Sequence, residues 1–133
     1  MMAFGLLIIR VVIGLLFVGH GAQKLFGVFG GYGPKGTGGF MESIGLKPGV
    51  AMAILAGLME LVGGALFTIG FLTPLAAILI ALTMLGAIVK VHAPNGLWST
   101  ANGYEYPLVL LVVVIGVAFI GAGDYSIDAV LNF

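Results

Sequence analysis

The stretch that decides the fold covers residues 50–91 and reads VAMAILAGLMELVGGALFTIGFLTPLAAILIALTMLGAIVKV. Its only charged residues are Glu60 and Lys90. A helix rises about 1.5 Å per residue, so an apolar run of roughly 20 residues can cross a hydrocarbon core about 30 Å thick. Gly70 can end one helix, and Pro74 suits the first turn of the next. The stretch therefore predicts two membrane-spanning helices, 50–72 and 75–91, joined as an antiparallel hairpin.

Two further apolar segments, residues 4–21 and 104–120, flank this hairpin. The first is not typical of a signal peptide, because no positive residue precedes it and Arg10 interrupts it. Backbone groups inside lipid must satisfy one another, which favours helices for all four segments. The predicted fold class is an all-α membrane protein: residues 1–133 form one transmembrane domain, a four-transmembrane-helix bundle. A short interfacial helix is expected at residues 40–44 in the first long loop.

The composition agrees with this fold class. Hydrophobic residues make up 61% of the chain and charged residues 8%, whereas a soluble domain carries about 25% charged residues. Five basic residues balance five acidic ones, which argues against nucleic-acid binding. The chain has no cysteine and only two histidines, so no metal site and no covalently bound cofactor are expected. Redox chemistry would need a bound small molecule or a partner protein.

An even number of spans places both long loops on one side of the membrane and both termini on the other. The basic residues outside or near the ends of the spans belong to the loop side: Lys24, Lys35, Lys47 and Lys90. Loops rich in lysine and arginine usually stay in the cytoplasm. The sequence therefore predicts a multi-pass protein of the cell membrane, with cytoplasmic long loops and both termini outside.

Arg10 and Glu60 are the ionisable residues deepest in the spans, where a charge is costly. Counted from the membrane face, their depths differ by about 6 Å, so we predict a buried ion pair. Glycines lie near both residues and would let the helices approach closely: Gly14, Gly21, Gly57, Gly63 and Gly64. Two interpretations stay open. The pair can be structural, or Glu60 can accept protons or anchor a ligand while Arg10 tunes its charge.

A second polar cluster is expected at the loop end of the bundle. Its candidate ligand-binding residues are His20, Gln23, Lys24, His92, Tyr104, Glu105 and Tyr106. Such residues can simply anchor the helices at the membrane interface. They also suit the headgroup of a quinone, whose ring favours aromatic contacts and whose carbonyl oxygens need hydrogen-bond donors. The residues alone do not decide between an interfacial belt and a quinone site.

At these positions the sequence resembles the DoxX family of small membrane proteins. The matching strings are His20-Gly21-x-Gln23-Lys24-Leu25-Phe26-Gly27, Gly57-x-x-Glu60-x-x-Gly63-Gly64, Gly103-Tyr104-Glu105-Tyr106-Pro107-Leu108 and Gly123-x-x-Ser126-x-Asp128. The resemblance implies four helices and an association with quinol oxidase, thiosulfate-oxidising or oxidative-stress systems. It implies a subunit or accessory role rather than a self-sufficient catalyst. Pro74 departs from the family, which often carries arginine after Thr73.

Our leading hypothesis is a quinone-interacting subunit or accessory protein of a membrane oxidoreductase or oxidative-stress system. Its expected partners are membrane lipid, a quinone-like lipophilic small molecule, oxidoreductase subunits and a second copy of the chain. Catalysis, if the protein takes part in it, would depend on those partners. The alternatives are a non-catalytic membrane scaffold for partner proteins and a small transporter of a lipophilic compound.

Overall fold

The computed structural model describes residues 1–132, and all regular structure in that range is helical. The α-helices are α1 (Met2–Phe26), α2 (Gly33–Ser43), α3 (Gly49–Ile69), α4 (Thr73–Ala87), α5 (Glu105–Ile120) and α6 (Ile127–Leu131). Between α4 and α5 lie a π-helical turn, η1 (Ile88–His92), and two 3₁₀ turns, η2 (Ala93–Asn95) and η3 (Ser99–Ala101). The predicted all-helical character is confirmed.

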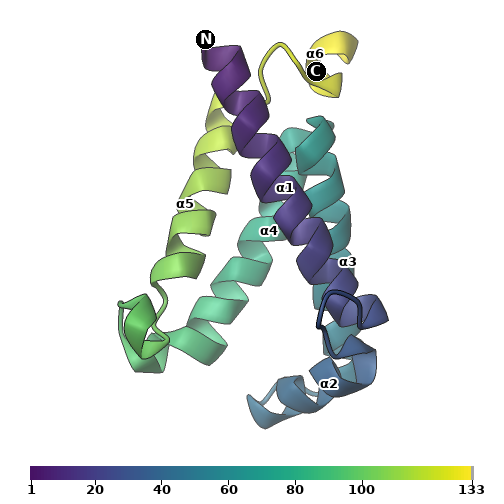
Figure 1. Cartoon of the computed structure of the whole chain (residues 1–133), viewed down its shortest axis with the longest axis vertical. Coiled ribbons are helices and arrows are strands. Elements are labelled where there is room, and N and C mark those ends of the chain that lie inside the picture. The colour runs from purple at the N-terminus through teal and green to yellow at the C-terminus, as the bar shows by residue number, and fades with distance from the viewer. Residues whose placement is uncertain (133) are drawn as a thin grey trace.

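Helices α1, α3, α4 and α5 run lengthwise, and both termini lie at one end of the molecule (Figure 1). We call this the terminal end, and the opposite end, which holds α2 and the turns η1 to η3, the loop end. Helix α1 packs along α3, α3 packs against α4, and α4 packs against α5. The hairpin predicted from Gly70 and Pro74 is present, with Pro74 in the first turn of α4.

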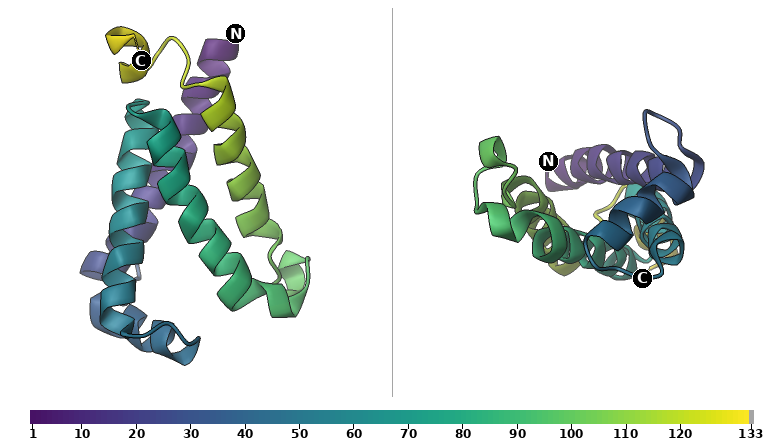
Figure 2. Two further views of the ribbon diagram at one scale, coloured as in Figure 1. Left: turned by 180° about the vertical axis from the view of Figure 1, so that it is seen from behind. Right: turned by 90° about the horizontal axis from the view of Figure 1, so that it is seen from below.

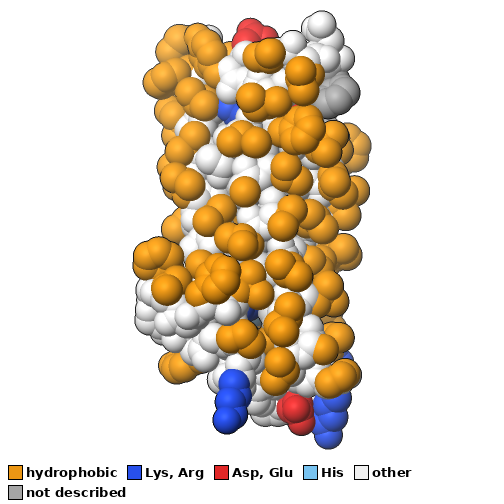
Figure 3. All heavy atoms as spheres, turned by 90° about the vertical axis from the view of Figure 1, so that its right-hand side faces the viewer, with side chains coloured by type: hydrophobic (Ala, Val, Ile, Leu, Met, Phe, Trp, Pro, Cys, Tyr) orange, Lys and Arg blue, Asp and Glu red, His pale blue; other side chains and the backbone are white. Residues whose placement is uncertain are grey.

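Three helical segments are long and apolar enough to cross a membrane: Met2–Phe26, Gly49–Ile69 and Thr73–Asn95. Helix α5 is equally apolar but has only 16 residues. Figure 3 shows hydrophobic side chains over the middle of the molecule and charged side chains toward its two ends. Large side chains such as Phe119, which is 89% exposed, point outward. This distribution suits a protein surrounded by lipid.

Glycines bring the backbones of α1 and α3 together. A Cβ atom added to Gly14 would lie 2.7 Å from the carbonyl oxygen of Gly64, and one added to Gly21 would lie 2.7 Å from that of Gly57. Any larger residue at these positions would force the helices apart. The predicted glycine-mediated packing of the first two spans is therefore present, and α1 and α3 form the tightest pair in the molecule.

Helix α2 begins earlier than the sequence suggests. The helix expected at residues 40–44 starts at Gly33 and includes four glycines, Gly33, Gly36, Gly38 and Gly39. Glycine disfavours helices, but here it permits contact. A Cβ atom added to Gly38 would lie 2.8 Å from the backbone nitrogen of Val50, at the start of α3. Close packing against α3 therefore outweighs the weak helix propensity of this segment.

The helical path of α4 continues past its α-helical part. After Ala87 it widens into the π turn η1, in which the backbone N–H of Ala93 donates to the carbonyl oxygen of Ile88. The 3₁₀ turn η2 then ends the segment at Asn95. The helical segment is thus longer than the predicted span of 75–91, and it carries His92 on its last turns.

Candidate functional site

A cavity of about 380 Å³ lies between α3 and α4 in the loop half of the molecule. The two helices touch near Gly63, where an added Cβ would lie 3.0 Å from Cβ of Leu79. From there they diverge toward the loop end, as Figure 2 shows. Helix α2 and the turn after it supply Phe40, Met41 and Leu46 to the wall. The cavity is therefore the space inside a splayed helical hairpin, covered at the loop end by α2.

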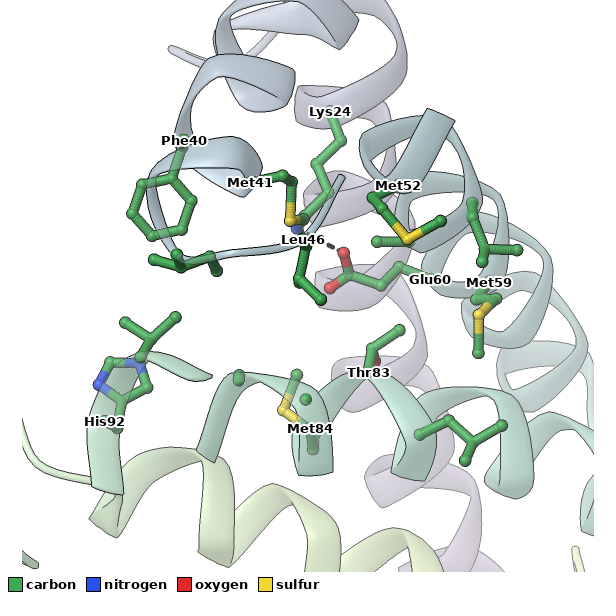
Figure 4. Close-up of a pocket in the computed structure, with 17 residues that line it drawn as sticks. Lys24, Phe40, Met41, Leu46, Met52, Met59, Glu60, Thr83, Met84 and His92 are labelled. Carbon is green, nitrogen blue, oxygen red and sulfur yellow. Dashed lines mark ion pairs between the residues drawn. The ribbon is translucent and has the colours of Figure 1, made fainter. Parts of the chain in front are cut away.

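The lining of this α3–α4 cavity is mostly apolar and rich in methionine. Four of the six methionines of the chain line it: Met41, Met52, Met59 and Met84. Methionine side chains are flexible and polarisable, and they make favourable contacts with aromatic rings. Polar side chains also line the cavity: Lys24, Glu60, Thr83 and His92 (Figure 4). The wall thus suits a flat apolar molecule that carries a polar group.

Lys24 and Glu60 form an ion pair in the cavity wall. Glu60 is only 3% exposed, and Lys24 reaches it from the last turn of α1. Gly57 makes this approach possible, because a Cβ added there would lie 3.2 Å from Cβ of Lys24. Removing one partner of a buried ion pair leaves the other charge uncompensated, which is costly. Chemically, the ammonium group can donate hydrogen bonds and the carboxylate can accept a proton.

The predicted ion pair between Arg10 and Glu60 is wrong. Nη2 of Arg10 instead donates to the carbonyl oxygen of Tyr125 at 2.6 Å, at the terminal end. In the observed packing Arg10 lies beside Gly70, whereas Gly21 lies beside Leu61, so Arg10 and Glu60 are about eleven helical residues, or about 16 Å, apart in depth. Side chains also lean toward the N-terminus of their own helix, so in antiparallel helices these two lean away from each other.

The terminal end holds its own polar cluster, which we call the terminal clamp: Arg10, Thr73 and Asp128. The Asp128 carboxylate accepts hydrogen bonds from the backbone N–H of Leu72 (2.7 Å), the N–H of Thr73 (3.0 Å) and the Thr73 hydroxyl (2.7 Å). The Asp128 N–H donates to the carbonyl oxygen of Gly70 at 2.8 Å. A carboxylate from the C-terminal segment therefore caps the first turn of α4.

These contacts set the charge of Asp128. Burial disfavours its charged form, but the hydrogen bonds from Thr73 and Leu72 and the positive charge of Arg10 outweigh that cost. The pKa of Asp128 is therefore held below its usual value. The clamp contains an ionised carboxylate whose acceptor sites are occupied by this chain, so it is a structural feature.

The seven loop-end candidates do not gather in one place. Lys24 and His92 line the α3–α4 cavity, and Nδ1 of His92 lies 2.9 Å from the carbonyl oxygen of Asn102. Gln23 lines a neighbouring depression that it shares with Lys24, and its Nε2 donates to the carbonyl oxygen of Phe29 at 3.0 Å. The ring of His20 lies 6.0 Å from that of Phe17, outside the lining of the α3–α4 cavity.

The three candidates from the start of α5 also lie outside the lining of this cavity. Glu105 accepts a hydrogen bond from the backbone N–H of Ser99 at 3.0 Å and so shapes the turn before α5. Tyr106 is half exposed, and Tyr104 precedes the helix as its N-cap residue. The cavity therefore combines Lys24 and His92 from the predicted loop-end cluster with Glu60 from the predicted deep pair.

Sequence reasoning did not identify the methionines or Thr83 as site residues. A usable pattern existed for two of them, because Met52 and Met59 are seven residues apart and share one face of α3. Met41 and Met84 come from other helices, and only the tertiary structure brings them to the same cavity.

Comparisons with known proteins bear on this arrangement. The DoxX family model matches residues 5–93. The chain is 35% identical to the "Putative oxidoreductase CatD" of Bacillus subtilis (strain 168), over 93% of this chain and 84% of the relative. It is 32% identical to an uncharacterized membrane protein of Mycobacterium tuberculosis, over 93% of this chain and 79% of the relative. No solved structure matches. The family match covers more than half of the chain, so this protein is a membrane protein that belongs to the DoxX family.

Proposed function

We propose that this protein binds a quinone-like lipophilic molecule in the α3–α4 cavity and serves a membrane oxidoreductase or oxidative-stress system as a subunit or accessory protein. The observation that carries the proposal is the Lys24–Glu60 ion pair in the wall of an otherwise apolar cavity between apolar helices. Ionisable groups at such a depth usually mark a ligand or proton pathway. The oxidoreductase name of a relative that aligns over 84% of its length agrees with this role.

The chemistry of the wall matches that of a quinone headgroup. The thioethers of Met41, Met52 and Met84 can contact the face or edge of an aromatic ring. The Lys24 ammonium can donate to a ring carbonyl oxygen, and Glu60 can exchange a proton with a ring hydroxyl. Because the chain has no cysteine, electrons would come from a partner oxidoreductase. The residues of this chain would bind and orient the ring and hold protons near it.

The proposal includes a placement in the membrane. Helix α5 would be a fourth span: its 16 residues rise about 24 Å, which tilt and local thinning of the bilayer can accommodate. Helix α2 would lie at the interface, and Lys35 and Lys47 would keep the loop end in the cytoplasm. With a cysteine at Lys35, an impermeant thiol reagent should fail to label intact cells. With a cysteine at Asp124, it should label them.

The binding test uses the full chain in lipid nanodiscs and a radiolabelled menaquinone with a four-isoprene chain. Glu60→Gln keeps the shape of the side chain and removes its charge, so Lys24 loses its ion partner. A charge-assisted hydrogen bond contributes about 1.5–3 kcal/mol, so we expect affinity to fall at least about tenfold. Lys24→Met should weaken binding to a similar extent.

The matched control is Glu42→Gln, which changes an exposed glutamate of α2 that does not line the cavity. It should bind menaquinone as the unmodified protein does. Equal affinity of the Glu60→Gln and Glu42→Gln variants would contradict the proposal and would favour the scaffold hypothesis.

A further inference from the structure

We infer that the natural ligand is an amphiphile with a polar ring and a long apolar chain, that it enters from the bilayer between α3 and α4, and that its chain stays in the lipid. This inference rests on the proposed function and adds the route of entry and the class of ligand. It follows from where the cavity opens, what closes its other sides and how much it can hold.

The cavity opens at the apolar middle of the hairpin. Leu55 of α3 and Leu82 of α4 both line the cavity, yet they are 50% and 52% exposed. A side chain that lines a cavity and is also half exposed lies at the rim of an opening. Each leucine lies well inside a segment that is apolar enough to span a membrane. The opening between them therefore faces hydrocarbon.

The chain closes the cavity toward both ends of the molecule. The α3–α4 contact at Gly63 closes it toward the terminal end. Helix α2 covers it toward the loop end and is held by the close contact of Gly38 with Val50. Lys24 and Glu60 project toward each other in the wall, as Figure 4 shows. A ligand that comes through the opening between the leucines would thus meet the ion pair with its leading polar group.

The volume limits what can be enclosed. Ligand sites commonly measure about 300–1,000 Å³, and this cavity of about 380 Å³ is at the small end. This volume suffices for a one- or two-ring headgroup and not for a long isoprenoid or alkyl chain as well. A chain attached to the ring would leave through the opening by which it entered.

The experiment compares two probes with the same ring in nanodiscs: menadione, which has no chain, and menaquinone with four isoprene units. Leu55→Trp and Leu82→Trp narrow the opening. Leu58→Trp and Leu85→Trp are the matched controls, since Leu58 and Leu85 are both 46% exposed on the same helices but do not line the cavity. We expect the rim variants to slow association of the chain-bearing probe at least about tenfold, and the controls to leave it unchanged.

The outcomes separate this inference from the proposed function. If rim and control variants behave alike while Glu60→Gln still weakens binding at least about tenfold, entry between α3 and α4 is wrong and the quinone site stands. Binding of menadione as tight as that of the chain-bearing probe would overturn the assigned ligand class. Full displacement of the probe by added phosphatidylglycerol would identify bulk lipid as the occupant of the cavity. That result would also overturn the assigned ligand class. If neither probe binds the unmodified protein, the proposed function itself fails.

Discussion

The molecule buries one carboxylate at its terminal end and another in the α3–α4 cavity, and the surroundings of the two differ. Asp128 at the terminal end is 8% exposed and accepts three hydrogen bonds from Leu72 and Thr73. Glu60 in the α3–α4 cavity is 3% exposed and, within residues 1–132, is paired with Lys24 alone. A buried polar group whose hydrogen bonds are made within the protein stabilises the fold. A buried polar group beside a cavity that can still accept hydrogen bonds is available to a ligand. The comparison separates a structural cluster from a candidate site.

The terminal clamp joins parts of the chain that are far apart in sequence. Arg10 and Tyr125 are 115 residues apart, and Asp128 is 55 residues from Thr73. Through these bonds the C-terminal segment holds the N-terminal half of α1 and the α3–α4 turn together. At the loop end, no comparable bond ties α4 to α3 within the described residues, and there the helices diverge.

The largest effect is expected from Asp128→Ala. It removes the cap of α4 and leaves Arg10 buried without its nearby carboxylate. Breaking such a buried charged network typically costs about 3–5 kcal/mol. We therefore expect a loss of about 3 kcal/mol in the free energy of unfolding, measured in detergent by thermal or denaturant melts. Asp124→Ala, a change to an exposed neighbour, should cost little. Similar losses in both variants would show that the clamp is not a structural feature.

A smaller effect is expected from double-mutant cycles on the charged residues. Lys24→Met and Glu60→Gln should couple, because each single change leaves the other charge unpaired. Polar contacts in membrane proteins couple by about 0.6 kcal/mol on average and seldom above about 1.7 kcal/mol. The cycle of Arg10→Met with Glu60→Gln should be additive, since these side chains lie at different depths. Coupling in the second cycle and none in the first would reverse the assignment of partners.

The smallest effect concerns pH. The pKa of Asp128 is lower in the folded protein than its unfolded value of about 3.9, so its ionised form stabilises the fold above about pH 4. That contribution should be lost as the pH falls from about 4 through the lowered pKa. Melting temperatures from pH 6 to pH 3 should thus fall more steeply for the unmodified protein than for Asp128→Asn. Parallel curves would show that Asp128 is not ionised in the clamp.

The apolar segments and the hairpin could be predicted from sequence because they depend on local composition and on Gly70 and Pro74. The partner of Glu60 could not be predicted in this way, because the depths of Arg10 and Glu60 were counted from assumed positions of the membrane faces. The lean of side chains toward helix N-termini already argued against Arg10. It favoured Lys24, a loop-end residue toward which Glu60 leans. The depth count ignored the direction in which each side chain leans along its helix.

The cavity could not be predicted because its walls come from four segments of the chain. Each of them looks ordinary alone: a glycine-rich helix, a methionine pair on α3, a threonine on α4 and a lysine at the end of α1. The role of Asp128 was equally hidden. Its motif was visible in the sequence, but the acceptor sites of its carboxylate are filled by residues more than 50 positions away.

The π turn η1 has a consequence for how relatives of this chain differ in length. Ala87 and His92 both line the cavity although they are five positions apart, and five positions of regular α-helix would turn His92 about 140° away from Ala87. The wider turn accommodates one extra residue and keeps the imidazole on the same side. A relative one residue shorter here could do the same with an ordinary α-helical turn. In an alignment, a single gap between these positions would then indicate a relative whose histidine still lines the cavity.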